Sequence, residues 1–536
     1  MIVGRILTLA GDHGLAEVAA IAIRDGRVVA AGSRADIDGL EGRHTRRIEL
    51  GPDEIALPGL TDSHLHLADA SLIRGQVDLG ELMTLGDGLA RVAQAHAVLD
   101  PAAWLLGNGW SRDRWGKWPT AAQLAAVAPG RRIALWAHDH HALWVSPEAL
   151  AVAGISSTSA DPAGGSIRRG EDGLPSGILH ETAVALVNRH VPAPTVGAYE
   201  TALPALAREL VVLGVVAAHD PGLLGSGPGL DGPHRAYANL ADSGRLPLRV
   251  HVSIRAEDLA SAISRGQRSG NALGADPAGR ARFGWLKLFA DGSMGSRTAA
   301  MLQPFDDEGG LGMWVTEPAM LERLTLRAAA AGIATPIHAI GDAAVHAALD
   351  AFRPAETRGQ ALWPRIEHAQ LVEPGDLPRF GGLGIVASIQ PVHLRADAAE
   401  ARRAWGSRAE EHGYAWRSLE ASGATLAFGT DAPVEPIDPW PGIALAIRRR
   451  WPGWPADASE FGPGQALSLD AALRAACVGP ARAEGAHDRG RLTVGQRADL
   501  IVIPAAALAE PSADDARLAT TRPSLVLIDG QVALEA

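Results

Sequence analysis

The chain is 536 residues long, carries a formal net charge of −12 and contains one cysteine, Cys477. The acidic balance argues against nucleic acid and anionic membranes as partners, and a lone cysteine excludes an internal disulfide and any Cys-Cys metal motif. Hydrophobic residues make up 47% of the chain, which suffices for a large core. Tryptophan is unusually frequent, since 14 Trp stand beside 7 Phe and 3 Tyr.

The N-terminal segment has no recognisable targeting signal. Arg5 and Asp12 interrupt its short apolar stretch, which excludes a secretory signal. No run of the sequence approaches the ~18 consecutive apolar residues of a membrane span. The most apolar stretch, residues 210–218, has the length of a strand. We therefore expect a cytoplasmic protein without a membrane partner.

Both ends of the chain are predicted to form β-structure. Residues 19–23 are a strand candidate, and Asp25-Gly26 supplies a hairpin turn after them. A second Asp-Gly pair follows a strand candidate near the C-terminus. The other candidates are residues 28–30, 48–57, 499–503 and 524–528. Because chain ends often lie close together, we expect residues 1–56 and 486–536 to build one composite β-domain.

The middle of the chain, residues 57–485, alternates short apolar runs with segments rich in Ala, Leu and Arg. Strands that alternate with helices at intervals of ~30–60 residues indicate βα units, and therefore a parallel sheet or barrel. The expected helices include residues 318–331 and 342–352. The expected strands are residues 208–218, 247–252, 283–290, 334–340, 365–369, 384–389 and 424–429.

Residues from about 80 to 200 fit this alternation poorly, so we interpret them as an insertion. The insertion holds six of the 14 tryptophans, namely Trp104, Trp110, Trp115, Trp118, Trp136 and Trp144. Their side chains could bury the insertion against the barrel, or they could line a largely apolar pocket. The sequence leaves both interpretations open. If they line the pocket, aryl or alkyl substrates should outperform small polar ones.

The segment LPGLTDSHLHL contains the sharpest local motif. His64 and His66 are two residues apart on an extended segment, so their side chains share one face. Neutral imidazole is a common ligand of zinc and similar divalent metals. By itself, however, the pair is a weak pattern, and two unrelated polar histidines at the end of a strand are the commoner interpretation.

Two further histidines end later apolar runs. His338 lies in IHAIGD, and His368 lies in IEHAQ, 30 residues further on. Taken alone, each fits a hydrogen-bonded core or loop histidine. In a parallel barrel, however, the C-terminal ends of the strands converge on one mouth. Four histidines at three such ends therefore predict a metal site there.

A lysine and an aspartate complete the set of candidates. Lys287 lies in an apolar strand on the same face as Phe289 and Asp291. Because a buried lysine is costly unless paired or neutral, it forms either an ion pair with Asp291 or a neutral amine that carbon dioxide can convert to a carbamate. Asp431 ends another strand and could be a metal ligand, a general base or a helix cap. Beside a histidine metal site, the role of proton acceptor is favoured.

Six motifs in order resemble the amidohydrolase superfamily, and more narrowly amidohydrolase family 3, a group that includes N-substituted formamide deformylase. The motifs are LPGLTDSHLHL, DHHALWVS, LKLFADGSMGSRTA, IHAIGDAAV, RIEHAQ and FGTDAPVEP. The resemblance spans nearly the whole chain. It implies an α/β fold: a distorted TIM (β/α)8 barrel over residues 57–485, with a composite β-sandwich from the two chain termini.

The resemblance also implies roles for the candidate residues. His64 and His66 would be ligands at strand one, His338 and His368 at strands five and six, and Asp431 at strand eight. Lys287 would be the strand-four lysine, carboxylated if two metal ions are bound. The expected cofactor is therefore one or two divalent ions, with zinc as the expected metal, and Asp431 is also the expected catalytic base.

Three residues are predicted to contact the substrate: His141, Arg297 and Trp110. His141 and Arg297 lie in motif-rich loops, and Trp110 lies in the tryptophan-rich insertion. One departure from the family is visible beside His141. The usual DGHAxW segment here reads DHHALW, so His140 replaces a glycine. If this loop faces the substrate, the additional imidazole narrows or polarises the pocket.

The predicted function is hydrolysis of a non-peptide carbon–nitrogen bond, an N-formyl or other N-acyl amide of a small molecule, by metal-activated water. The alternative is an ester, lactone or phosphoester cleaved at the same site, which the ligand set cannot distinguish. A non-catalytic scaffold is a third interpretation, disfavoured because the histidines and Asp431 are all retained. Whether the protein is a homo-oligomer is left open.

Overall fold

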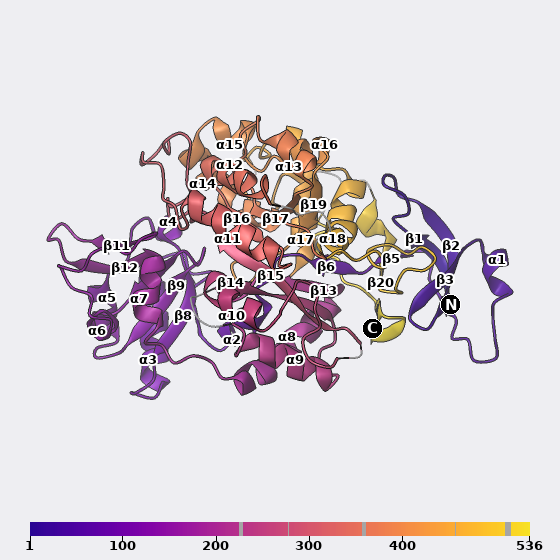
Figure 1. Ribbon diagram of the computed structural model, residues 1–536, viewed down its shortest axis with the longest axis horizontal. Coiled ribbons are helices and arrows are strands. Elements are labelled where there is room, and N and C mark those ends of the chain that lie inside the picture. The colour runs from indigo at the N-terminus through magenta and orange to yellow at the C-terminus, as the bar shows by residue number, and fades with distance from the viewer. Residues whose placement is uncertain (225–228, 277, 356–360, 456, 510–515, 536) are drawn as a thin grey trace.

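The structure is a computed structural model that describes residues 1–224, 229–276, 278–355, 361–455, 457–509 and 516–535. In these residues, three sheets organise the chain along the long axis of the molecule (Figure 1). A sheet built from both termini lies at one end, and a barrel occupies the middle. The sheet of the insertion lies at the other end (Figure 1).

Eight parallel strands form the central sheet, and each pairs with the next barrel strand along the chain. They are β6 (Leu60–Asp62), β13 (Val215–Asp220), β14 (Arg249–Arg255), β15 (Ala281–Phe289), β16 (Pro336–Ala339), β17 (Arg365–His368), β18 (Val386–Ile389) and β19 (Thr425–Phe428). The sheet nearly closes, because the Ser63 amide after β6 donates to the Phe428 carbonyl at 2.8 Å. This is a TIM-like barrel, as the sequence predicts.

One predicted strand is divided in the structure. Residues 208–218 were expected to be a single strand, but their first part ends the helix α8 (Val196–Val212), and β13 begins at Val215. Gly214 between them has a φ of +90°, which lets the chain leave the helix. The apolar run could not show this boundary, because Leu210 and Val211 in the last turn of α8 and all of β13 are buried.

Helices follow the barrel strands and cover the outside of the barrel (Figure 1). The predicted helices correspond to α11 (Pro318–Ala330) and α12 (Asp342–Phe352). The others are α2 (Leu67–Ile73), α9 (Pro233–Asp242), α10 (Leu259–Ser264), α13 (Leu377–Leu383), α14 (Leu394–Trp405), α15 (Arg408–Glu411), α16 (Trp416–Ala421), α17 (Pro439–Arg448) and α18 (Leu469–Ala483). No helix of the described residues is long and apolar enough to span a bilayer.

The terminal sheet joins the two ends of the chain. Its strands are β1 (Ile2–Leu7), β2 (Glu17–Arg24), β3 (Arg27–Gly32), β4 (Ile48–Glu49), β5 (Glu54–Pro58), β20 (Leu500–Pro504), β21 (Leu525–Ile528) and β22 (Gln531–Glu535), and α1 (Arg34–Asp38) follows β3. β20 pairs antiparallel with β5, so C-terminal strands continue the N-terminal sheet. The described ladders form one continuous sheet, so the composite sandwich and its boundaries at 1–56 and 486–536 stay predictions.

Both predicted Asp-Gly hairpins are confirmed in this sheet. Asp25 and Gly26 have φ angles of 50° and 74°, and Asp529 and Gly530 have φ angles of 52° and 70°. A two-residue turn of this kind needs positive φ at both positions, which Asp tolerates and Gly favours. The first turn joins β2 to β3, and the second joins β21 to β22.

The insertion forms a sheet of its own between the first two barrel strands. Its strands are β7 (Val77–Asp78), β8 (Leu105–Trp110), β9 (Ile133–Ala137), β10 (Ala142–Val145), β11 (Gly165–Arg169) and β12 (Pro175–Glu181). Its helices are α3 (Leu85–Val98), α4 (Arg112–Trp115), α5 (Ala121–Val127), α6 (Pro147–Val152) and α7 (Ala185–Asn188). Trp110, Trp115 and Trp144 pack on one another in its core, with ring centroids 5.9–6.4 Å apart.

Candidate metal centre and active site

The four predicted histidines converge at one end of the barrel. His64 and His66 follow β6, whereas His338 lies in β16 and His368 ends β17. The ring of His64 lies 5.4 Å from that of His66 and 5.1 Å from that of His368, and the His338 and His368 rings are 4.5 Å apart. All four side chains are buried. The register of the parallel strands therefore brings together residues that are up to about 300 positions apart in the sequence.

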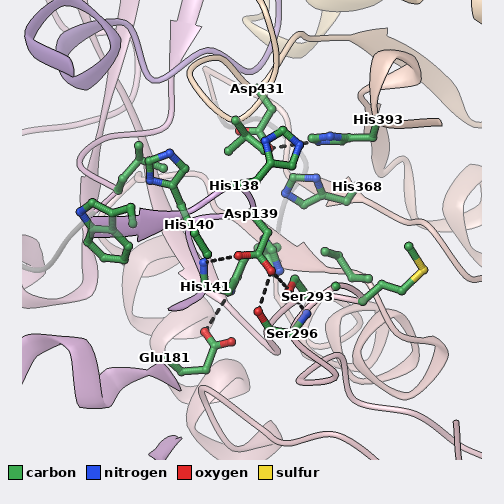
Figure 2. Close-up of a pocket in the computed structure, with 18 of the residues that line it drawn as sticks. His138, Asp139, His140, His141, Glu181, Ser293, Ser296, His368, His393 and Asp431 are labelled. Atoms are coloured by element: carbon green, nitrogen blue, oxygen red, sulfur yellow. Dashed lines mark hydrogen bonds and ion pairs between the residues drawn. The ribbon is translucent and has the colours of Figure 1, made fainter. Parts of the chain in front are cut away.

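Asp431 links these rings after β19. Its Oδ1 lies 3.3 Å from His64 Nε2 and 3.5 Å from His66 Nε2, and its Oδ2 lies 3.2 Å from Nε2 of His393 (Figure 2). Asp431 is not a helix cap, because the next helix, α17, is capped by Asp438. Burial favours the neutral acid, but the neighbouring His64 and His393 rings hold the pKa of Asp431 well below its usual range.

Three of the four histidines have a lowered pKa and are therefore neutral, the form that can bind a metal. Burial is the largest influence on His66, His338 and His368, and it lowers the pKa of each ring well below its ordinary value. These imidazoles are therefore neutral at pH 7, with lone pairs free for a cation. His66 Nδ1 is held by the Gly222 carbonyl at 2.7 Å, which leaves Nε2 as the ligand atom.

Lys287 of β15 lines the same cavity as the four histidines. Its Nζ is buried without a hydrogen-bond partner and lies 4.8 Å from the centroid of the Phe289 ring. Burial lowers the pKa of Lys287 to about 8. The structure forms no ion pair between Lys287 and Asp291; instead, that carboxylate accepts hydrogen bonds from the backbone amides of Ala300, Ile340 and Gly341 at 2.8–3.1 Å. The lysine is thus left available for chemistry.

A buried ion pair supports the centre from inside the barrel. Glu367 of β17 holds His64 Nδ1 at 2.6 Å with one carboxylate oxygen and Arg365 Nε at 2.7 Å with the other. Both Glu367 and Arg365 are fully buried. Burial favours the neutral acid, but Arg365 and His64 lower the pKa of Glu367 far below that of a free carboxyl. Glu367 therefore stays ionised and fixes which nitrogen of His64 faces the cavity.

A second buried cluster consists of His219, His251 and Glu484. Glu484 Oε2 is 3.2 Å from His219 Nε2 and 2.9 Å from His251 Nδ1. Two arginines occupy the remaining polar positions: Arg365 lies 3.0 Å from His219 Nδ1, and Arg489 lies 3.2 Å from Glu484. Since Arg489 already pairs with the one carboxylate of this cluster and a guanidinium lies against His219, we assign the cluster a structural role rather than a metal.

A cavity of about 480 Å³ opens above the ligands, between the barrel and the insertion. Trp118 and Trp136 line it with partly exposed rings. Trp110 borders it but is only 1% exposed and packs with Trp115 and Trp144 in the core of the insertion, and Trp104 packs in a neighbouring cluster. Both interpretations of the tryptophans are therefore partly correct. The lining combines aromatic faces with a few polar groups, as is typical of sites for small molecules.

The turn of residues 138–141 crosses this cavity (Figure 2). Asp139 accepts hydrogen bonds from Ser293 and Ser296 at 2.6 Å each, and these fix the turn against the barrel. His140 has a φ of 56°, a conformation that favours glycine, and it stacks on Trp136 at 5.6 Å. Burial lowers the pKa of His140 to about 4, and its Nδ1 has no hydrogen-bond partner. A neutral imidazole thus faces the cavity at this position.

His141 pairs with Glu181 at 2.9 Å and lies 5.1 Å, ring to ring, from His338. Burial favours the neutral ring, but Glu181 and Asp139 raise the pKa of His141 to about 9.

Because the pKa of His141 exceeds that of a free histidine, the ion pair of His141 with Glu181 stabilises the fold fully below about pH 6.5. This contribution is lost as the pH rises through 9. We expect the free energy of unfolding of the chelator-treated protein, measured with urea, to fall by on the order of 3 kcal/mol between pH 6 and pH 9.5. His141→Gln should lack this decline. Identical pH dependence of the two proteins would contradict the pairing.

Arg297 is not among the residues that line the cavity. It forms ion pairs with Asp307 and with Glu400, and only Glu400 of these three lines the cavity. The predicted substrate contact of Arg297 therefore has no support in the geometry, because its guanidinium is already held by two carboxylates. His141 and Trp110 both line the cavity, as their predicted roles require.

A model of the amidohydrolase family matches residues 53–534. The chain belongs to the amidohydrolase family. Membership places it among the metal-dependent hydrolases, in agreement with the buried clusters of His and Asp side chains described above.

Three relatives illustrate the similarity. This amidohydrolase is 32% identical over 510 residues to Protein LONG AFTER FAR-RED 3 of Arabidopsis thaliana, with 93% of this chain and 86% of the relative covered. It is 25% identical over 503 residues to N-substituted formamide deformylase of Arthrobacter pascens, with 90% and 89% covered. A solved structure, an uncharacterized metal-dependent hydrolase of Pyrococcus horikoshii OT3, is 28% identical, with a TM-score of 0.73 and 95% and 98% of the chains covered.

Sequence reasoning missed several groups of this amidohydrolase site. His393, which contacts Asp431, follows the predicted strand at 384–389, so its place after a strand end was a usable signal. Glu435 lies four residues beyond Asp431, 3.5 Å from His138 and 3.0 Å from Arg395. Glu435 lies in the motif FGTDAPVEP, but its role was not recognised, because its partners come from other segments of the chain.

Proposed function

We propose that this amidohydrolase cleaves the carbon–nitrogen bond of a small, non-peptide amide, an N-formyl or other N-acyl amine, with metal-activated water. One observation carries the proposal. Four buried imidazoles and the Asp431 carboxylate converge at the floor of a single aromatic-lined cavity.

The donor set fits a divalent ion. His64, His66 and Asp431 offer ligand atoms that all lie within 4.8 Å of one another, as do His368, His393 and Asp431. His368 Nδ1 is also buried without a hydrogen-bond partner. Nitrogen and carboxylate donors suit zinc, which we propose as the ion, with His338 and Lys287 beside it. When bound, such an ion supplies Lewis acidity and lowers the pKa of coordinated water from ~15.7 toward ~7.

Asp431 then acts as the base and acid of the reaction. Its carboxylate is held ionised by the surrounding imidazoles, so it can accept a proton from the attacking water. The leaving nitrogen is poor unless protonated, and Asp431 can return the proton to it. His141 borders the same point, and Glu181 occupies its Nδ1, so its Nε2 is the atom that remains for substrate.

The cavity lining indicates an apolar or aromatic substrate group. Trp118, Trp136 and Phe289 line the cavity with partly exposed rings. A turnover screen of N-formyl, N-acetyl and N-carbamoyl amines, each beside its ester counterpart and supplied with zinc or manganese, tests the bond class. Release of an amine or ammonia supports the proposal. Release of alcohol alone would show that the bond is an ester, and the absence of both turnover and tightly bound metal would indicate a scaffold.

We further propose that Lys287 carries a carbamate in the metal-loaded protein. The neutral amine attacks carbon dioxide, the new N–C bond forms, and one proton leaves, which gives an anionic ligand from a group that is otherwise buried and unpaired. The chain contains only two lysines, Lys117 and Lys287, and Lys117 is exposed. After loading with ¹³C-bicarbonate and metal, we expect a carbamate signal by NMR that persists in Lys117→Met and disappears in Lys287→Met. A signal in neither protein would exclude the modification.

A further inference from the structure

One arginine of the cavity lining is without a partner. Arg114, in the short helix α4, lines the cavity, and its Nη1 is buried without a hydrogen bond. Nor does its side chain form an ion pair with any of the residues that the structure describes. The other lining arginines each have a partner: Arg112 pairs with Glu308, Arg403 pairs with Glu400, and Arg255 donates to the Leu223 carbonyl and lies over the Phe289 ring.

The surroundings of Arg114 are rich in cations. Arg112 comes from the same turn, and its Nη1 is also buried without a hydrogen bond, 3.8 Å from Asp113. The ring of Trp118 has Arg112 at 5.4 Å and Arg168 at 4.6 Å from its centroid. Cation–π contacts leave the guanidinium donors of these arginines free for hydrogen bonds, because they use only the planar face.

The acids on this part of the lining do not satisfy Arg114. Glu400 is shared by Arg297 and Arg403, and Glu308 holds Arg112. Asp113 faces Glu400, and burial together with that carboxylate raises the pKa of Asp113 to about 6. A buried guanidinium donor without an acceptor is costly, and a ligand that supplies a carboxylate removes that cost.

We propose that Arg114, with Arg112 beside it, binds the carboxylate of an N-acylated amino acid with an aromatic or large apolar side chain. This inference deepens the amide hydrolysis proposed above and rests on it. Guanidinium groups pair with carboxylates through two parallel hydrogen bonds, so one contact both holds and orients the substrate. Trp118 also lines the cavity, and its partly exposed ring presents surface for the side chain.

The test compares N-formylphenylalanine, as each enantiomer, with N-formylphenethylamine, which differs only by the carboxylate. In the wild-type holoenzyme, we expect kcat/KM for one enantiomer of the acid to exceed that for the neutral amide at least tenfold, mainly through KM. Arg114→Met should remove this preference, and Arg114→Lys should keep part of it. Lys117→Met is the matched control, because it removes an exposed cation three residues away that does not line the cavity.

If neither compound is hydrolysed, their binding to the wild-type holoenzyme is measured by calorimetry. Tighter binding of the acid that Arg114→Met abolishes then supports the subsite, while the proposed bond class fails. Should Arg114→Met lose its fold by circular dichroism, Arg114→Gln replaces it. A wild type that handles acid and neutral amide equally, or a preference that survives in both uncharged variants, overturns the inference.

Discussion

Replacement of Asp431 by asparagine is expected to lower kcat by about 10³-fold, because general acid–base catalysis by a positioned carboxylate contributes ~10²–10⁴-fold. The amide of asparagine has nearly the same shape, but it cannot accept the proton of the attacking water. The four histidines proposed as ligands remain, so we expect the variant to retain its metal. Steady-state kinetics and metal analysis on the same preparation measure both outcomes.

The matched control is Asp376→Asn. Asp376 is also a buried carboxylate, but it pairs with His346 and Arg379 away from the cavity. Turnover should survive in this control. Undiminished turnover in Asp431→Asn would eliminate its role as base, and loss of the metal together with turnover would show that Asp431 acts first as a ligand.

The second large effect is expected at Glu367. Glu367→Gln removes the charge that faces Arg365 at 2.7 Å and His64 at 2.6 Å. It leaves Arg365 buried without a counter-ion, so the free energy of unfolding should fall by about 3–5 kcal/mol. Metal affinity should fall about 10–100-fold, because the hydrogen bond that orients His64 is weakened. Urea unfolding of chelated protein and competition with a chelating dye measure the two quantities.

A double variant separates these effects. Arg365→Met/Glu367→Leu replaces the buried pair by apolar side chains of similar volume, so stability should largely recover. Metal affinity should stay low, because His64 has still lost its carboxylate. Recovery of both quantities would show that Glu367 positions His64 by packing alone. Since the pKa of Glu367 is lowered in the folded protein, its stabilisation is present above about pH 4.3 and is lost as the pH falls below that value.

The site residues that could be predicted are those that the local sequence around them identifies. His64 and His66 were recognisable because two imidazoles share a face of one strand end. His338, His368 and Asp431 were recognisable because each ends an apolar run, and parallel strands present those ends together. In the structure, these five residues lie around one point.

The parts that could not be predicted depend on pairing between distant segments. Glu367 is adjacent to His368 in sequence, yet its partner is His64, 303 residues away. Arg297 lies in a motif-rich loop, but two carboxylates hold it behind the lining. No local pattern distinguishes an arginine that is already paired from one, like Arg114, that is left free.

Length and composition by themselves determined that this is a large folded protein, rich in tryptophan, and the order of motifs determined its family and barrel. These properties are local or periodic, so a linear sequence records them directly. Only the tertiary structure decided which tryptophans line the cavity and which arginine is unpaired. The reason is physical: burial, desolvation and ion pairing depend on distances between segments that the chain brings together only when it folds.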